Sequence, residues 1–282
     1  MQSNLTSLNI KSLFQFNRNI IAMIIKNKIL SLSAMAAVLA VAWGNAQAHT
    51  RFEIATIPEG ARSDNNVMIP HGCADQPVIG TITVFPDVGM SLVDISNDAN
   101  AAIGAETFAR SEQFATDFVQ GISIAGIQSR DTFSVSELIR DGNGNPVGVR
   151  SAGGSIPPSN WVAKLPVRIS AVNIVPESCA SKVILVPAIA NVCQLTSLAE
   201  INGKDSDRLD VDFWTAPDAG HPNFDAPAWN YPAPITVTRN LDSNPLPASC
   251  GEGVAVRIYP SAEQLNRDFP VKFDGVQVWP AP

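Results

Sequence analysis

The sequence predicts an all-β protein built as a sandwich of sheets, and three features indicate it. Apolar residues fall in short runs, and the chain is rich in turn formers, with 18 glycines and 21 prolines. Several runs alternate in character, as in 81–85 and 254–258, which is typical of a sheet that is buried on one face. Because two such faces can bury each other, we expect a sandwich of the immunoglobulin or cupredoxin type.

Eight segments are expected to be strands, because each is a short apolar or alternating run bounded by turn residues. They are 67–69, 79–85, 167–175, 182–186, 209–214, 235–238, 254–259 and 276–279. Segment 99–120 carries three phenylalanines among Ala, Glu and Gln, and forms either a short helical insertion or a long connection. The Asp-Gly-Asn-Gly-Asn-Pro run at 141–146 has dense turn chemistry and predicts a hairpin tip.

Residues 1–48 are predicted to be a secretory signal peptide. They carry four basic residues and no acid, and they end in the apolar run 29–43 followed by small residues. That run is shorter than the roughly 20 residues that span a bilayer. Ala46 and Ala48 fit a signal-peptidase site, so cleavage is expected after Ala48, and Met23 offers a second start. The exported protein, periplasmic or secreted, would then begin at His49.

The charge of the exported part excludes some partners. It keeps all 26 acidic side chains but only 15 basic ones, so its net charge is −11. Such a charge repels phosphate backbones, and no Lys/Arg cluster offsets it, so we expect no nucleic-acid partner. No further apolar run reaches membrane-spanning length, so we expect no membrane span after cleavage.

Four cysteines, Cys73, Cys179, Cys193 and Cys250, remain in the exported part. An even number in an exported protein predicts two disulfides. The spacing contains no C-x-x-C pair, and free thiolates for a metal would be oxidised in that compartment. The sequence leaves three pairings open.

A histidine at the start of a chain offers an unusual metal site, because its free amine and its imidazole can chelate one ion together. The amine has a pKa of about 7.7–8.0 and the imidazole about 6.5, so both can lose their protons near neutral pH. Nitrogen ligands of this kind favour copper(II). The alternative is that His49 only follows the cleavage site and has no role.

Five short motifs follow one another along residues 49–238. They are Ala48-His49-Thr50-Arg51-Phe52-Glu53, Pro70-His71-Gly72-Cys73, the segment 186–193 that ends in Asn191-Val192-Cys193, Val211-Asp212-Phe213-Trp214-Thr215-Ala216-Pro217, and Tyr231-Pro232-Ala233-Pro234. Their order and spacing resemble the YcnI-like family of exported copper-binding domains, which hold copper in a histidine brace. The chain differs from the family in segment 91–159, in Asn191 where the family has Gln, and in an added C-terminal segment.

The resemblance implies a copper-binding β-sandwich over 49–238, with a C-terminal extension, 239–282, packed on it. It also implies a Cu²⁺ site made by the amine and imidazole of His49, with Glu53 and Trp214 close by. Glu53 falls on the same face of a first strand and would ligate weakly or bond the amine, unless it is an exposed strand carboxylate. Trp214 would shape the site and exclude water, unless it is an ordinary core aromatic.

The resemblance further implies that Cys73 pairs with Cys193, which leaves Cys179 and Cys250 to tie the extension to the sandwich. His71 adjoins Cys73 and is expected to support the site beside the ligands rather than to bind the ion itself. His221 lies in a loop after Trp214 and is expected at the surface, with a lesser role in completing the coordination.

The function expected from these observations is copper(II) binding, for handling or delivery of copper together with another periplasmic or membrane copper protein, without catalysis. An enzymatic alternative is a copper monooxygenase acting on polysaccharide, which would need His71 or His221 as a second imidazole. A third is a metal-free structural or adhesion sandwich in which His49 is incidental. The chain has no G-x-S-x-G or H-E-x-x-H motif for a hydrolase. Solvated strand faces explain the acid pairs Asp205/Asp207 and Asp210/Asp212.

Overall fold

Strands dominate the structure. The computed structural model describes residues 49–198 and 210–282, and these contain strands β1 to β17, the short helix α2 and two 3₁₀ turns. The predicted signal peptide and the Asp205/Asp207 pair lie outside the described residues. The predicted all-β class is confirmed. Within the described ranges, no helix is long and apolar enough to cross a bilayer.

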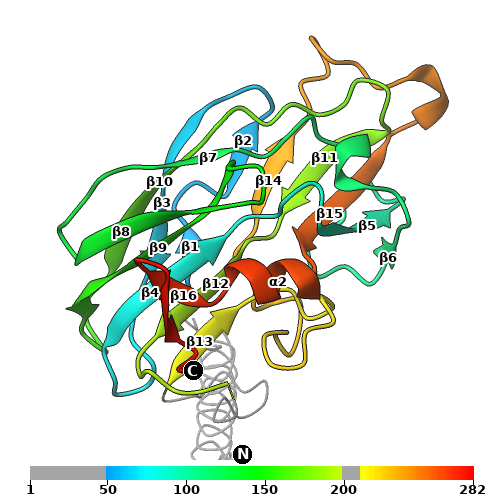
Figure 1. Cartoon of the computed structure of the whole chain (residues 1–282). Helices are drawn as coiled ribbons and strands as arrows, with labels where there is room; N and C mark the ends of the chain where they lie inside the picture. The colour runs from blue at the N-terminus through cyan, green and yellow to red at the C-terminus, as the bar shows by residue number, and fades with distance from the viewer. Residues whose placement is uncertain (1–48, 199–209) are drawn as a thin grey trace, which may run out of the picture. The chain divides into compact units, whose positions relative to one another are not determined.

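Three sheets carry the fold (Figure 1). The four-stranded sheet has the order β1 (Arg51–Phe52), β3 (Ser63–Ile69), β10 (Ala163–Ile169), β7 (Ile124–Gly126). The five-stranded sheet has the order β13 (Val211–Trp214), β12 (Ala188–Val192), β4 (Val78–Val84), β9 (Pro146–Ile156), β8 (Phe133–Arg140). The six-stranded sheet has the order β2 (Thr56–Pro58), β14 (Ile235–Thr238), β11 (Ala180–Leu185), β15 (Val254–Pro260), β5 (Ser91–Ser96), β6 (Ala109–Arg110).

The main core lies where the inner faces of the three sheets meet. Alternating residues of β3, such as Val67 and Ile69, are buried in it, and they share it with Leu185 of β11 and Ile258 of β15. Ile189 of β12 brings the five-stranded sheet into the same cluster. Alternation of this kind is what a strand needs to bury one face. The runs 81–85 and 254–258, whose alternation predicted one buried face, are instead buried at nearly every residue, so the expectation of one exposed face is wrong for them.

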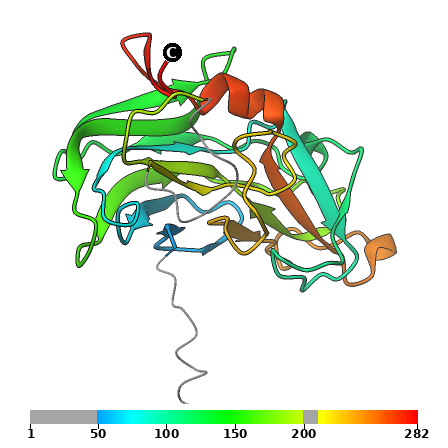
Figure 2. The same cartoon turned by 90° about the horizontal axis from the view of Figure 1, so that it is seen from below.

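A second core covers the outer face of the five-stranded sheet. Its cover comes from the C-terminal end of the chain, namely α2 (Ala262–Asp268) and the hairpin of β16 (Val271–Phe273) and β17 (Val276–Trp279). Figure 2 shows this red segment on one side of the sheet and the blue strands β1 and β3 on the other. The five-stranded sheet is therefore buried on both faces, and β12 has no exposed residue.

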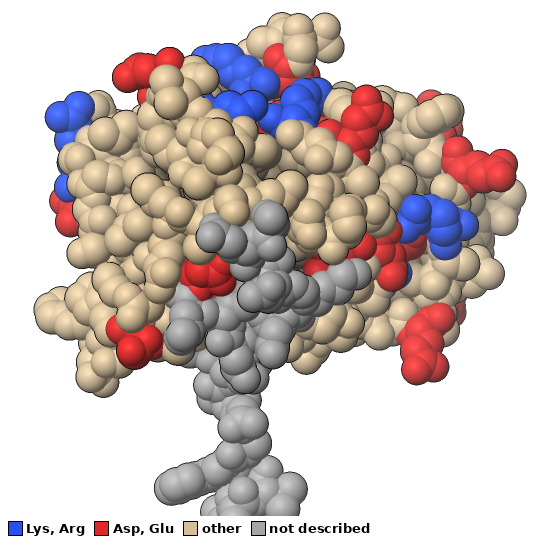
Figure 3. Space-filling view, turned by 60° about the horizontal axis from the view of Figure 1, so that its bottom comes forward, with Lys and Arg blue, Asp and Glu red and all other residues tan. Residues whose placement is uncertain are grey.

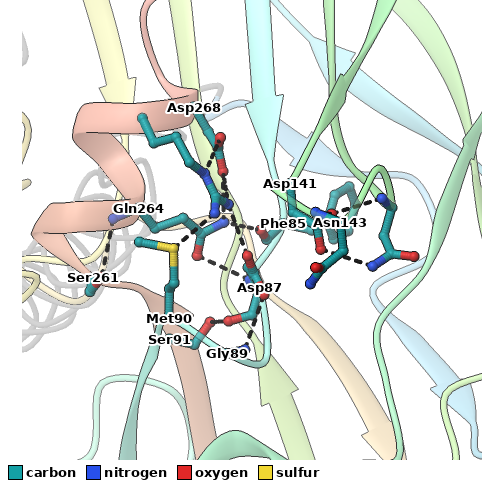
Figure 4. A network of polar contacts seen from close by, with 12 residues as sticks. Phe85, Asp87, Gly89, Met90, Ser91, Asp141, Asn143, Ser261, Gln264 and Asp268 are labelled. Carbon is teal, nitrogen blue, oxygen red and sulfur yellow. Dashed lines mark hydrogen bonds and ion pairs between the residues drawn. The ribbon is translucent and has the colours of Figure 1, made fainter.

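Polar contacts fasten α2 to the loop that follows β4 (Figure 4). Gln264 donates from Nε2 to the carbonyl oxygen of Phe85 at 2.8 Å and accepts from the backbone N–H of Asp87 at 3.0 Å. Arg267 binds the carboxylates of Asp87, at 2.9 Å, and Asp268, at 2.7 Å. Buried polar groups are thus paired with one another, which fixes the helix on the sheet.

The segment 239–282 also completes the six-stranded sheet. β15 lies inside that sheet, parallel to β11 and antiparallel to β5. Removing it would separate β11 from β5, so the extension contributes to the sandwich as well as packing on it. The disulfide Cys179–Cys250 joins the segment before β11 to the turn before β15, and Cys73–Cys193 is also formed. Both bridges agree with the pairing that the family resemblance implies.

Three local predictions can be compared with the structure. Segment 99–120 is a connection that carries the short strand β6 and the 3₁₀ turn η1 (Ala115–Asp117), not an α-helix. The strand expected over 167–175 ends at Ile169, because its partner β3 begins at Ser63 opposite that residue. The hairpin tip is confirmed between β8 and β9, where Gly144 has a φ of 85° that favours glycine.

Candidate metal centre

His49 packs against two aromatic rings instead of extending into solvent. It lies two residues before the start of β1, which pairs with β3 through Arg51 and Met68. Its imidazole is half-buried, with the ring centre 4.9 Å from that of Trp214 and 6.1 Å from that of Tyr231. The Tyr231 ring lies within 18° of parallel to it. The imidazole therefore has a defined place on the sandwich.

Trp214 contributes the buried wall of this site. Its side chain is 5 % exposed and belongs to the main core, on the inner face of β13. Its indole Nε1 is buried and has no hydrogen-bond partner among the described residues. A buried indole N–H usually finds an acceptor. Trp214 is thus a core aromatic that also contacts His49, so it combines the two roles that the sequence left open.

Asn191 anchors the residue that follows His49. Its side chain is 1 % exposed, and its Nδ2 donates to the hydroxyl of Thr50 at 2.8 Å. The hydroxyl of Thr81 in turn donates to Asn191 Oδ1 at 3.1 Å. Asn191, where the motif that the chain resembles has Gln, therefore ties Thr50 to the middle of the five-stranded sheet.

Asp212 is an acidic residue of this region whose burial the sequence did not indicate. It lies directly opposite Asn191 in the β12–β13 pair, and it is 5 % exposed. The expectation of a solvated strand face is therefore wrong for Asp212. The alternation of β13 could have indicated it, because Asp212 and Trp214 are two residues apart and must share a face.

His71 follows the end of β3 beside the Cys73–Cys193 disulfide. Its Nδ1 lies 2.5 Å from the carbonyl oxygen of Gly72. A carbonyl only accepts, so Nδ1 must carry the proton, and the neutral ring then keeps its lone pair on Nε2. Metal-binding histidines commonly donate their other N–H to a carbonyl in this way.

The two histidines interact electrostatically. Burial of the His49 imidazole lowers its pKa from the ordinary value of 6.5, and the nearby charge of His71 lowers the pKa further. A lowered pKa means that the ring is uncharged at neutral pH, which is the state in which nitrogen can bind a metal. The structure thus brings His49, His71, Trp214 and Tyr231 into one region.

Glu53 follows β1 and is exposed. Its carboxylate accepts hydrogen bonds from Lys164 Nζ and, at 2.6 Å, from Asn66 Nδ2. These bonds, the one from Lys164 first, hold the pKa of the Glu53 carboxyl below its usual range. Glu53 therefore has partners on β3 and β10, and its role beside copper stays a prediction.

His221 is a core residue, so the expected surface position is wrong. It is 3 % exposed, stacks on Phe224 at 4.2 Å, and its Nε2 lies 3.1 Å from Asn266 Oδ1 in α2. Phe224 packs on Phe213, which points to the outer face of the five-stranded sheet, whereas its neighbour Trp214 points inward. The strand alternation thus separates His221 from the face that His49 contacts.

The arrangement limits the kind of metal site that these residues can form. Within residues 49–198 and 210–282, no three His, Cys, Asp or Glu side chains are grouped to hold a metal ion. An amine–imidazole chelate needs only one such side chain, because the backbone nitrogen supplies the second donor. Uncharged residues cover most of the face seen in Figure 3, with acidic side chains scattered over it and basic ones at its top and at both sides.

Tyr231 is the neighbour of His49 to which the sequence assigned no role. It lies in the Tyr-Pro-Ala-Pro motif, and its ring is 6.4 Å from that of Trp214.

No protein-family model matches the chain, and a search of curated proteins finds no match either. The likeness to the YcnI-like family therefore stays a prediction from the five motifs.

Proposed function

We propose that this protein, once its chain begins at His49, is an exported protein that binds one copper(II) ion for copper handling or delivery. The observation that carries the proposal is the packing of the His49 imidazole at 4.9 Å from the buried Trp214 ring. A residue that only follows a cleavage site needs no such place, since chain termini are usually loosely held. The two disulfides suit an oxidising compartment outside the cytosol.

The residues present fit a copper(II) ion of this kind. The amine and imidazole of His49 would hold it, and copper(II) is the divalent ion for which nitrogen donors have the highest affinity. Trp214 would form a dry wall beside it, and Asn191 holds the side-chain hydroxyl of Thr50, the residue that follows His49, and so helps to keep both nitrogens of His49 in place. When bound, the ion would supply a redox-active centre at the surface of the sandwich.

A second candidate function draws on one observation. His71 is close enough to His49 to lower its pKa when both rings are protonated, and in the neutral His71 ring, with its proton on Nδ1, Nε2 has a lone pair, so His71 has the chemistry of a second imidazole ligand. Two imidazoles and an amine are the donors that a copper monooxygenase requires. Copper carriage remains the preferred proposal, because the amine and imidazole of His49 alone are sufficient for it.

The test compares copper(II) binding among matched variants of the exported protein. The mature N-terminus is first sequenced, and copper(II) is then titrated against wild type, His49→Ala, His71→Ala, and a variant with one alanine inserted before His49. The inserted alanine keeps the imidazole and displaces the free amine, so it isolates the chelate. We expect one ion per wild-type chain, and loss of tight binding in both His49→Ala and the insertion variant.

The outcomes separate the candidates. Unchanged binding in His49→Ala would remove the proposal, as would a mature chain that starts at another residue. Retained tight binding with a changed electron paramagnetic resonance spectrum in His71→Ala would place His71 among the ligands and favour the second candidate. Trp214→Phe should fold and bind copper with an altered spectrum, and an identical spectrum would leave Trp214 as an ordinary core residue.

A further inference from the structure

A row of polar side chains crosses the inner face of the five-stranded sheet, where a sandwich normally buries apolar groups. The strand registers place Asp212 opposite Asn191, Asn191 opposite Thr81, Thr81 opposite Ser151, and Ser151 opposite Ser136. One side chain from each of the five strands thus stands in line. Burying a hydroxyl without a partner costs free energy, so such a row needs an explanation.

One half of the row is explained by the fold itself. The Thr81 hydroxyl donates a hydrogen bond to Asn191, and Asn191 donates one to the Thr50 hydroxyl, so each of these three buried polar groups has a hydrogen-bond partner. The other half lines a cavity between the five-stranded and the four-stranded sheets. This cavity has a volume of about 260 Å³, and the loop 127–132 between β7 and β8 forms part of its wall.

Some hydroxyl groups in this cavity have hydrogen-bonding capacity that the described residues do not use. Thr83 lies two residues from Thr81 on the same face of β4, is 5 % exposed, and lines the cavity; no hydrogen bond of its hydroxyl is found among the described residues. Ser151, also 5 % exposed, shares a single hydrogen bond of 2.8 Å with Ser136. Because only one of these two hydroxyls can donate in that bond, the other keeps a free proton. The cavity wall therefore offers unused donors and acceptors on one side.

The rest of the wall carries no net charge, and apart from Gln128, Ser129 and Thr132 of the loop 127–132 it is mainly apolar. Its apolar side chains include Val67, Phe133, Leu138, Val149, Leu165 and Val167. The one ionisable side chain in the lining is Glu137, and Arg150 neutralises it with hydrogen bonds of 2.8 and 3.2 Å. A charged ligand would find no counter-ion there. A cavity of about 150 Å³ already admits benzene, so the present volume admits a substituted ring.

We propose that this cavity is a binding site for a small uncharged amphiphile, with an apolar body between the sheets and a hydroxyl or carbonyl end on Thr83, Ser151 and Ser136. The site combines apolar walls with a few convergent polar groups, which is the usual composition of small-molecule sites. It does not depend on copper, and its test is independent of the proposed function.

The test uses phenol, benzene and benzoate as probes of the metal-free protein. Titrations followed by amide chemical shifts should give saturable shifts for phenol in β4, β8, β9 and β10, and none for benzoate. Thr83→Val removes the hydroxyl at nearly constant volume, so it should weaken phenol binding roughly fivefold, the effect of one net hydrogen bond, and leave benzene binding unchanged. Thr236→Val, on β14 of the six-stranded sheet, is the matched control and should change neither.

The same measurements can overturn the proposal. An absence of saturable phenol shifts in wild type would show that the cavity holds water only. Shifts located away from the residues that line the cavity, in these four strands, β3, β7 and the loop 127–132, would place the probe elsewhere. Equal phenol affinity in Thr83→Val and wild type, or binding of benzoate, would refute the assignment of the polar end. If Thr83→Val does not fold, the wild-type shift pattern and the benzoate comparison still decide the matter.

Discussion

Replacing Asn191 by alanine should destabilise the protein strongly, because the side-chain amide of Asn191 in β12 binds both Thr81 in β4 and Thr50, which precedes β1. The side chain is 1 % exposed and makes hydrogen bonds of 2.8 Å to Thr50 and 3.1 Å to Thr81. Each bond contributes about 1 kcal/mol net, and the hydroxyls left behind lose a partner in the interior. We therefore expect Asn191→Ala to lower the free energy of unfolding by about 2–3 kcal/mol.

Urea unfolding of the metal-free protein measures this effect without reference to copper. A double-mutant cycle with Thr50→Val isolates the Asn191–Thr50 bond, and a coupling of about 1 kcal/mol is expected. Asn143→Ala, at the exposed hairpin tip, is the control and should stay within about 0.5 kcal/mol of wild type. A loss in Asn191→Ala no larger than that of the control, or a coupling near zero, would refute the reasoning.

Three further predictions concern the six-stranded sheet. Replacing Cys179 and Cys250 by serine removes a disulfide that closes a loop with a sequence separation of 71 and so gives the unfolded chain more conformational freedom. The free energy of unfolding, measured by urea unfolding, should fall by roughly 4 kcal/mol. A loss below about 1 kcal/mol would contradict this. Arg257, held between Phe108 and Trp229 at 4.2 and 3.6 Å, pairs with buried Asp94. Arg257→Met leaves that carboxylate with Arg110 and Tyr259 as partners, so it should lower the free energy of unfolding by about 1.5–3 kcal/mol, the contribution of a hydrogen bond to a charged group. A neutral or stabilised variant in urea unfolding would contradict this. Burial, and then the charge of Asp94, raise the pKa of Tyr259 above its ordinary value of 10.0. Above about pH 10 the unfolded state therefore releases a proton that the folded state retains, so the free energy of unfolding should fall as the pH rises. Over that range the thermal midpoint of Tyr259→Phe should fall less than that of wild type.

Local patterns predicted some of the strands, such as β4, β11, β14, β15 and β17, but not β5, β8, β9 or β12, and they did not predict which strands pair with one another. The alternation of 254–258 correctly predicts β15. Its place inside the six-stranded sheet, parallel to β11 and far from it in sequence, depends on pairing partners that no local pattern specifies. The same holds for segment 167–175, where the strand ends because its partner begins opposite Ile169.

The candidate site shows the same division. The sequence identified His49 and Trp214 as neighbours through the motif resemblance, and the ring distance of 4.9 Å agrees. It did not reveal that His221 and Asp212 are buried, because polar residues in loops and short strands are usually solvated. A polar residue is buried when a distant segment of the chain packs over it, and α2 packs over His221 in this way.

By itself, the sequence determined the all-β class, the positions of some strands, the even cysteine count and the amine–imidazole chemistry available to a chain that begins with His49. These follow from side-chain period, turn chemistry and functional groups, which are local properties. Only the tertiary structure decided that Asn191 holds Thr50, that β15 completes a sheet, and that a row of hydroxyls opens into a cavity. These features depend on strand register and on contacts between distant segments, and a register is set by the packing of the whole sandwich.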